Sequence, residues 1–352
     1  MKKLIAILMS ALLAAGLLAA CAGGTDPSST AAPSQPESTA SEPASLPEPE
    51  STPKADPVAV RIAGLKGPTT MGMVKLMDDA ENGLYADDYQ VEMAGTADEI
   101  VPKLVSGELD MAAIPANLAA VLYNNSQGIR VAAINTLGVL YVVETGETIQ
   151  SIEDLRGKTI YSTGKGTTPE FALNYILTKN GIDPAGDLTI EYKSESTEIA
   201  ALLAEATDAV AVLPQPYVTA MQMQNENVRI ALSLSDEWDK VGAGSSLVTG
   251  VLVARVDWID ENPEAFENFL AAYAESINWV NANTEDAAEL VAKYGIVEKA
   301  PVAAKALPYC NIVCITGDEL ETRLSGYLQA LYDQNPEAVG GALPEAEFYY
   351  KG

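Results

Sequence analysis

The sequence predicts an α/β fold in which mostly parallel sheets carry helices on both faces. Short apolar runs typical of buried strands alternate with amphipathic segments of helical period, and this alternation occurs in two successive stretches of the chain. The chain beyond residue 57 has room for two units of about 100–200 residues each. Since 48% of the residues are apolar, each unit has enough hydrophobic residues to form a core.

Hydrophobic spacing assigns the elements of the first unit. Met73, Leu76 and Met77 fall on one face of a helix, because residues three and four apart share a face. A later helix is expected to stop near Gly107, since glycine commonly ends helices. The predicted elements are strands 58–63, 89–94, 111–114, 131–134 and 139–143, and helices spanning 73–84, 100–107 and 117–124.

The second unit repeats the pattern and is followed by longer helices. Phe171, Tyr175 and Ile176 lie on one face of a helix that Asn180-Gly181 should end. After residue 253 the pattern changes to long amphipathic helices, of which Phe266 to Val280 is the clearest. The predicted strands are 159–163, 189–192, 209–213, 228–234 and 248–253.

The start of the chain predicts an export signal. Lys2 and Lys3 precede an apolar run, Leu4 to Leu18, that is shorter than the about 20 residues of a stable membrane anchor. The small residues that follow and end at Cys21 resemble the lipobox of bacterial lipoproteins, in which that cysteine is lipidated. We therefore predict a signal peptide over 1–20, with an ordinary signal peptide and an incidental cysteine as the alternative.

Residues 21–57 predict a tether between the lipid and the folded part. The stretch from Ala22 to Pro57 consists almost entirely of Ser, Thr, Ala, Pro and Glu. Such a segment cannot bury enough apolar surface to offset the entropy of ordering, so we expect it to be disordered. The protein is then expected on the extracytoplasmic face of the cell membrane, held there by its lipid.

Composition excludes several function classes. The chain has 49 Asp plus Glu against 21 Lys plus Arg, which disfavours nucleic acid as a partner. It has no histidine, so histidine-based triads and zinc sites are excluded. Cys310 and Cys314 are expected to be buried and unbridged, although a bent backbone between them would allow a disulfide. We expect no catalytic residues, no metal and no cofactor.

Two loops of similar sequence carry the main functional clue. Lys66-Gly67-Pro68-Thr69-Thr70 and Lys165-Gly166-Thr167-Thr168-Pro169 each lie between a strand and a helix. Threonines at a helix start can cap its free N–H groups, which is the structural interpretation of each loop taken alone. One such loop in each unit suggests a ligand held between them, since ligands of open α/β sheets lie outside the carboxyl ends of the strands. The candidate ligand-binding residues are Thr69, Thr70, Gly166, Thr167 and Thr168, with Asn117 at another helix start as a weaker candidate.

Five further segments carry a family resemblance. Together, in their order and spacing, they resemble a type II periplasmic solute-binding protein of an ABC importer, similar to the group that serves thiamine precursors, sulfonates, taurine and nitrate. The resemblance extends over Val58 to Gly352. The segments are Ser151–Ile160, Gly166–Phe171, Gly181–Pro184, Asp208–Pro216 and Asn262–Ala265.

The resemblance implies two α/β lobes joined by two crossing strands. Residues 58–141 and 247–352 would form lobe 1, and residues 142–246 would form lobe 2, with the ligand enclosed when the lobes close. It also implies that Gln215 faces the cleft, where many members of the family carry glutamate. That difference weakens the case for a cationic or amine-bearing ligand, and the few basic residues near the predicted cleft, chiefly Lys66 and Lys165, do not require a strongly anionic one.

The implied function is capture of a small polar organic solute and its delivery to an ABC permease and its ATPase, by a monomer. A sensory or accessory lipoprotein that binds the same ligand without transport is the alternative. An enzyme on the same fold is disfavoured, because the related pyrimidine-forming proteins use histidine chemistry that this chain lacks.

Overall fold

A computed structural model describes residues 56–352 of the chain. The predicted signal peptide, Cys21 and nearly all of the predicted tether lie outside these residues. The strands are β1 (Ala59–Leu65), β2 (Asp88–Ala94), β3 (Met111–Pro115), β4 (Ile129–Leu137), β5 (Leu140–Glu144), β6 (Thr159–Ser162), β7 (Thr189–Tyr192), β8 (Val210–Pro214), β9 (Arg229–Ser233), β10 (Val248–Arg255) and β11 (Ile312–Ile315).

The helices alternate with these strands, as the sequence predicted, and the longest ones follow β10. The α-helices are α1 (Pro68–Met71), α2 (Val74–Glu81), α3 (Ala97–Ser106), α4 (Ala116–Ser126), α5 (Thr168–Lys179), α6 (Ser196–Glu205), α7 (Tyr217–Gln222), α8 (Leu234–Val241), α9 (Val256–Glu261), α10 (Pro263–Ala282), α11 (Thr284–Lys293), α12 (Ala300–Ala306) and α13 (Gly317–Gln334). Short 3-10 turns are η1 (Ile152–Leu155), η2 (Leu307–Tyr309), η3 (Pro336–Val339) and η4 (Ala346–Phe348).

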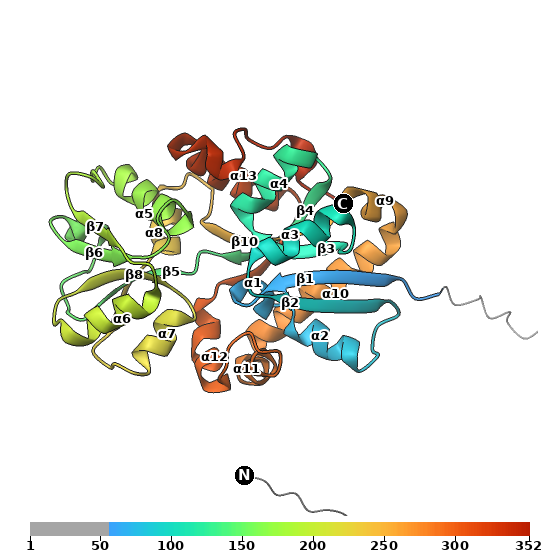
Figure 1. The fold of residues 1–352 in the computed structure, drawn as a ribbon, viewed down its shortest axis with the longest axis horizontal. Coiled ribbons are helices and arrows are strands. Elements are labelled where there is room, and N and C mark those ends of the chain that lie inside the picture. Colours follow the sequence, from blue (N-terminus) through green and yellow to red (C-terminus); the bar gives the residue numbers. More distant parts are fainter. Residues whose placement is uncertain (1–55) are drawn as a thin grey trace, which may run out of the picture. The chain divides into compact units, whose positions relative to one another are not determined.

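The strands form two separate sheets (Figure 1). The first has six strands in the order β11-β4-β10-β3-β1-β2, and the second has five in the order β7-β6-β8-β5-β9. In the first sheet β2, β1 and β3 are parallel, while β10 runs antiparallel to both β3 and β4. In the second sheet β7, β6 and β8 are parallel, and β5 runs antiparallel to β8 and β9. The predicted two-sheet α/β architecture is confirmed.

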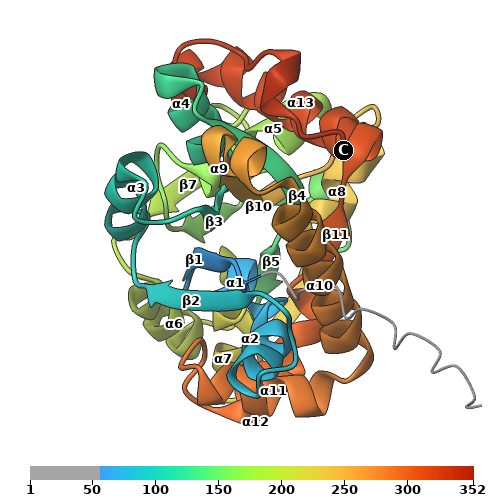
Figure 2. The same cartoon turned by 90° about the vertical axis from the view of Figure 1, so that its right-hand side faces the viewer.

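Helices cover both faces of each sheet. In the first sheet α4 and α13 lie on one face and α2 and α11 on the other (Figure 2). In the second sheet α5 and α8 cover one face, and α6 and α7 cover the other (Figure 1). One apolar cluster extends from α3, α4 and α13 to α5 and α8, so the two sheets share part of their core. Among the described helices, none is long and apolar enough to span a membrane.

The chain passes between the sheets twice. It leaves the first sheet between β4 and β5 at Gly138, where a Cβ atom would collide with the side chains of Ser235 and Leu247. Only glycine fits this close approach. The chain returns from α8 to β10 through the buried residues Ser245, Ser246 and Leu247. Both passages are therefore tightly packed.

Several sequence predictions need correction. The helix predicted over 73–84 ends at Glu81, so Leu84 lies beyond it and is 68% exposed. Val105 lies in the last turn of α3 and is 67% exposed. The predicted strand 228–234 ends at Ser233, whose hydroxyl accepts a hydrogen bond from the Asp236 N–H and starts helix α8. Strand β11 was not predicted.

The cysteine prediction is partly confirmed. Cys310 and Cys314 are both free thiols, and Cys310 is buried. Cys314 is only half-buried, because it lies on β11, which pairs with the sheet on one side only. Burial raises the pKa of both thiols, to about 12 for Cys310.

Candidate functional site

Four strand-to-helix loops end at corresponding edges of the two sheets. β1 and β3 are parallel neighbours in the first sheet, and β6 and β8 are parallel neighbours in the second. The loops after these strands therefore lie side by side within each sheet, at the carboxyl ends where α/β folds place ligands. The predicted site residues all belong to these loops or to the helices they open, namely Thr69, Thr70, Asn117, Gly166, Thr167, Thr168 and Gln215.

The loop after β1 holds its two threonines inside the protein. Thr70 is fully buried, its hydroxyl donates to the Leu65 carbonyl at 2.7 Å, and it packs so closely on Gly64 that a Cβ there would overlap it. Thr69 is 7% exposed and packs against Gly250 of β10. Neither threonine caps α1, whose first residue follows Gly67 without a side-chain cap. The capping interpretation is therefore wrong for this loop, because Thr70 instead holds the loop to its strand.

The loop after β6 is more exposed and also lacks a side-chain cap. Thr167 occupies the N-cap position of α5, but its hydroxyl donates back to the Gly164 carbonyl at 2.6 Å. The Thr168 hydroxyl lies 3.3 Å from the Tyr327 hydroxyl on α13 and so links the two sheets' helices. Gly166 has φ +77° and donates its N–H to the Glu170 carboxylate. The Gly166 N–H, which an anionic ligand would use, is therefore already paired with a carboxylate.

Asn117 and Lys165 are directed elsewhere. The Asn117 side-chain nitrogen donates to the Ala338 carbonyl at 3.3 Å and so attaches α4 to η3. The Lys165 side chain is exposed, and its ammonium lies 5.9 Å from the centre of the Tyr192 ring, in a groove on the outer strand β7. Each therefore has a partner within its own half of the protein.

Gln215 follows β8 and differs from the other predicted residues. It is 2% exposed, and its side-chain oxygen accepts hydrogen bonds from the N–H and the hydroxyl of Thr219, at 3.2 and 2.9 Å. Its side-chain nitrogen is buried and has no hydrogen-bond partner among residues 56–352. Buried polar atoms are nearly always partnered, so this nitrogen needs an explanation.

The end of β4 contains two polar residues that the sequence analysis missed. Asn135 is 1% exposed and Thr136 is fully buried, at the edge where Gly250 pairs with Thr136. Both polar atoms of the Asn135 side chain and the Thr136 hydroxyl lack partners among the described residues. A Cβ at Gly250 would lie 2.7 Å from the Asn135 side-chain oxygen and would also overlap Thr69. The sequence did contain a signal for this site, because an Asn-Thr pair interrupts an apolar strand just before Gly138, where the chain leaves the first sheet.

One cavity is lined from both halves of the protein. It has a volume of about 490 Å³, and α7 forms one wall while α12 and η2 form the other. Beside it the Tyr141 hydroxyl donates to the Tyr309 carbonyl at 2.6 Å, and burial raises the pKa of Tyr141 well above its usual value. The lining residues are Thr219, Gln222, Met223, Lys305, Pro308 and Tyr309.

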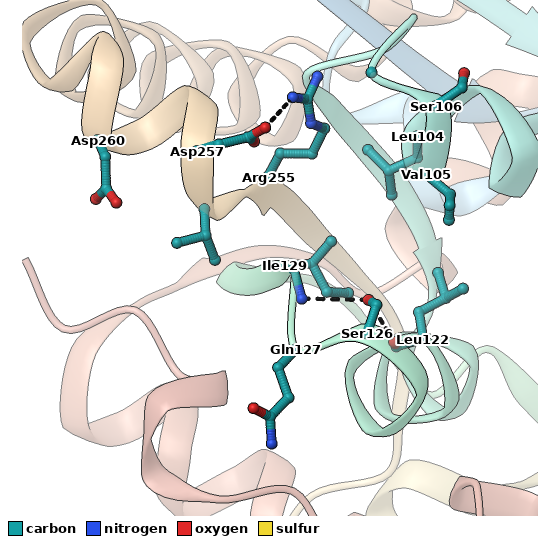
Figure 3. Close-up of a pocket in the computed structure, with 13 residues that line it drawn as sticks. Leu104, Val105, Ser106, Leu122, Ser126, Gln127, Ile129, Arg255, Asp257 and Asp260 are labelled. Atoms are coloured by element: carbon teal, nitrogen blue, oxygen red, sulfur yellow. Dashed lines mark hydrogen bonds and ion pairs between the residues drawn. The ribbon is translucent and has the colours of Figure 1, made fainter.

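A second cavity, of about 570 Å³, lies at the opposite edge of the first sheet (Figure 3). It is bordered by the ends of α3 and α4 and by the start of α9, where the parallel strands begin. Arg255 on its wall forms ion pairs with Asp257 and Asp110. Because α/β folds place ligands at the carboxyl ends of their parallel strands, this cavity lies at the edge opposite the candidate ligand site. Within residues 56–352, no group of three or more Cys, Asp or Glu side chains could hold a metal ion.

Comparison with known proteins supports the same architecture. The profile of the family described as ABC transporter, phosphonate, periplasmic substrate-binding protein matches residues 71–307. A Brucella abortus protein described as a candidate binding protein is 26% identical over 209 residues, which cover 58% of this chain and 62% of that protein. The chain thus spans less than two thirds of that relative.

Two solved structures share the fold. An ABC transporter structure from Parabacteroides distasonis superposes with a TM-score of 0.68 at 23% identity, covering 84% of this chain and 99% of that one. The periplasmic aliphatic sulphonate binding protein of Escherichia coli superposes with a TM-score of 0.65 at 17% identity, covering 84% and 92%. At these identities the likeness establishes the fold.

Proposed function

The chain belongs to the family of ABC transporter, phosphonate, periplasmic substrate-binding proteins, and from this premise we propose that it captures a small polar organic solute between two lobes and delivers it to an ABC permease and its ATPase. The family consists of substrate-binding transport proteins and not of enzymes. The observation that carries the proposal is the set of four strand-to-helix loops at the carboxyl ends of parallel strands in both sheets.

The proposed lobes are residues 58–141 with 247–352 and residues 142–246. The proposed site lies where the loops of the two lobes approach the two segments that pass between the sheets. It comprises Thr69 beside the buried Asn135 and Thr136 in lobe 1, and Gly166, Thr167, Thr168 and Gln215 in lobe 2. Asn117 in lobe 1 is a weaker member, because its side chain would first have to leave the Ala338 carbonyl. Thr70 supports the site indirectly, because its hydrogen bond to the Leu65 carbonyl fixes the loop after β1. The buried members of this set, Thr69, Asn135, Thr136 and Gln215, are neutral hydrogen-bonding groups and not cations.

We expect ligand binding to close the two lobes. A ligand that contacts both lobes stabilises the closed state by its greater affinity for that state. The segments around Gly138 and Leu247 would act as hinges, with the lobes moving as rigid bodies. Small-angle scattering of the protein with its co-purified solute, and after the solute is removed by partial unfolding and refolding, should show a smaller radius of gyration in the bound form.

The control for this experiment is re-addition of the extracted solute, identified by mass spectrometry, which should restore the compact form. Equal radii of gyration with and without saturating solute would contradict lobe closure. A preparation that neither carries nor binds any small molecule would contradict solute capture itself.

We also propose that the protein is anchored by a lipid on Cys21 after removal of residues 1–20, with residues 21–57 as the tether and a monomeric binding domain. The family is extracytoplasmic, which agrees with an anchor on that face of the membrane.

Cys21→Ala is expected to abolish incorporation of a fatty-acid analogue and to release the protein from membranes or leave it unprocessed. The measurement is metabolic labelling followed by membrane fractionation. Cys314→Ala is the matched control, because it removes a half-buried thiol from the folded part and should leave labelling intact. Equal labelling of wild type and Cys21→Ala would exclude lipidation at this residue.

A further inference from the structure

Gln215 carries a hydrogen-bond donor that the protein leaves without an acceptor. The residue is 2% exposed, and its backbone N–H donates to the Val139 carbonyl at 2.9 Å, in the crossing between the two sheets. Its side-chain nitrogen has no partner among residues 56–352. An unsatisfied buried donor typically costs about 1–3 kcal/mol. The nitrogen therefore marks a position where a group from outside the chain can complete the hydrogen bonding.

Thr219 decides which end of the amide remains free. The Thr219 backbone N–H and hydroxyl are directed at the Gln215 side-chain oxygen, at 3.2 and 2.9 Å. If the amide were turned over, its nitrogen would face the Thr219 N–H, and two donors would oppose each other. The oxygen is thus used within the protein, and only the donating nitrogen is left.

The Gln215 donor lies near the junction between the two proposed lobes. Gln215 directly follows β8 at the carboxyl edge of the second sheet, and Thr219 lines the cavity of about 490 Å³ between α7 and α12. The opposite wall of that cavity comes from Lys305, Pro308 and Tyr309. The Gln215 side chain is therefore hydrogen-bonded to a residue that lines this cavity.

The buried charged side chains also favour a ligand that presents an acceptor to Gln215. Among the described residues, the buried charged side chains are Asp110, Glu144 and Glu237, and no lysine or arginine is buried. Asp110 and Glu144 are already paired with arginines, and Glu237 with Lys240. An enclosed ammonium group would meet a donor at Gln215 and would find no free buried carboxylate, and a buried charge is costly without a partner.

We propose that Gln215 determines specificity and that Thr219 is its positioning residue. Together they select solutes that present an acceptor oxygen at this point, whether of a carbonyl, a carboxylate, a sulfonate or a phosphonate, and they reject solutes that present an amine or ammonium group there. This inference rests on the proposed function, because it concerns the same solute site.

The test uses calorimetric titration of the purified full chain with four probes: methylphosphonate, ethanesulfonate, uracil and putrescine. The first three offer acceptor oxygens of different charge and so separate the possible sources, while putrescine offers only ammonium groups. Wild type should bind at least one acceptor probe and not putrescine. Gln215→Glu replaces the donor by an acceptor of the same shape and should weaken that binding at least tenfold.

Thr219→Val tests the positioning role without changing Gln215. It removes the hydroxyl but keeps the backbone N–H, so we expect binding three- to tenfold weaker, and Thr219→Ser should restore it. Thr322→Val is the matched control, because the Thr322 hydroxyl bonds within α13 on the exposed surface. Melting curves for every variant establish folding, and Thr219→Val keeps the proposal testable if Gln215→Glu does not fold.

Two results overturn the inference while leaving solute capture in place. One is unchanged or tighter binding of the acceptor probe by Gln215→Glu and Thr219→Val. The other is wild-type binding of putrescine alone, or a gain of putrescine binding in Gln215→Glu with no loss of the acceptor probe. If wild type binds none of the probes and carries no small molecule by native mass spectrometry, the proposed function fails and the inference fails with it.

Discussion

Replacing Trp238 by alanine is expected to lower the free energy of unfolding by about 3–5 kcal/mol, the range for truncating a large buried aromatic side chain. Trp238 is fully buried on α8. Its ring stacks on Tyr175 of α5 with centroids 4.1 Å apart and lies 5.7 Å from Tyr327 of α13. Its indole N–H also donates to the Ser245 hydroxyl at 3.0 Å, in the segment that returns to β10.

Removal of the Trp238 indole should affect more than the packing around the cavity that it leaves. The indole joins helices of the second sheet to α13 and to the crossing segment, so its removal should loosen both contacts. Denaturant unfolding measures the effect. Trp279→Ala is the control, because Trp279 is only half-buried and should cost much less. A loss below about 1 kcal/mol for Trp238→Ala would mean that the neighbouring rings collapse into the space.

Glu144→Gln is expected to destabilise the protein by about 3 kcal/mol at pH 7, at the lower end of the range for breaking a buried ion pair. The Glu144 side chain is fully buried and pairs with the Arg229 guanidinium, which is 33% exposed and so retains some solvation after the change. Its oxygens also accept hydrogen bonds from the Ile149 N–H at 3.1 Å, the Thr148 N–H at 3.2 Å and the Thr148 hydroxyl at 3.1 Å. This carboxylate therefore holds the turn after β5.

The pH dependence of stability gives a second readout for the same variant. Burial raises the pKa of Glu144, but the hydrogen bonds from Ile149 and Thr148 and the charge of Arg229 outweigh burial and lower it below 4.5. A group whose pKa is lower in the folded state stabilises the protein above its unfolded pKa, and this contribution is lost as the pH falls. Wild type should therefore lose more stability than Glu144→Gln between about pH 4.5 and the lowered pKa.

Glu147→Gln is the matched control, since Glu147 is an exposed carboxylate in the same turn and should change neither stability nor its pH dependence appreciably. Unfolding free energies at several pH values compare the three proteins. Parallel curves for wild type and Glu144→Gln through the acid range would show that Glu144 has no lowered pKa in the folded state.

Much of the architecture could be predicted from local patterns. Helix α5 was expected from the spacing of Phe171, Tyr175 and Ile176 and from the Asn180-Gly181 stop, and it spans Thr168–Lys179. The strands next to it were located to within one or two residues for the same reason. Helix α8 escaped prediction because its start depends on one hydroxyl, that of Ser233, within a stretch that looks like a continuing strand.

The candidate site was predictable only as a set of loops. Both threonine loops lie at strand-to-helix junctions, as their sequence indicated, but the roles of their hydroxyls could not be inferred. Thr70 bonds the strand before it, and Thr168 meets Tyr327, which is 159 residues away. Asn135 and Thr136 were missed because the sequence does not show whether a polar pair in a strand finds hydrogen-bond partners in the folded protein.

The sequence by itself determined that this chain alternates strands and helices in two units and that it resembles solute-binding proteins, because the periods of 2 and 3.6 residues and the order of the motifs are properties of short stretches. The tertiary structure decided which polar groups stay free. Whether a buried donor such as the Gln215 amide finds an acceptor depends on residues from distant parts of the chain, and only the packed fold brings those residues together.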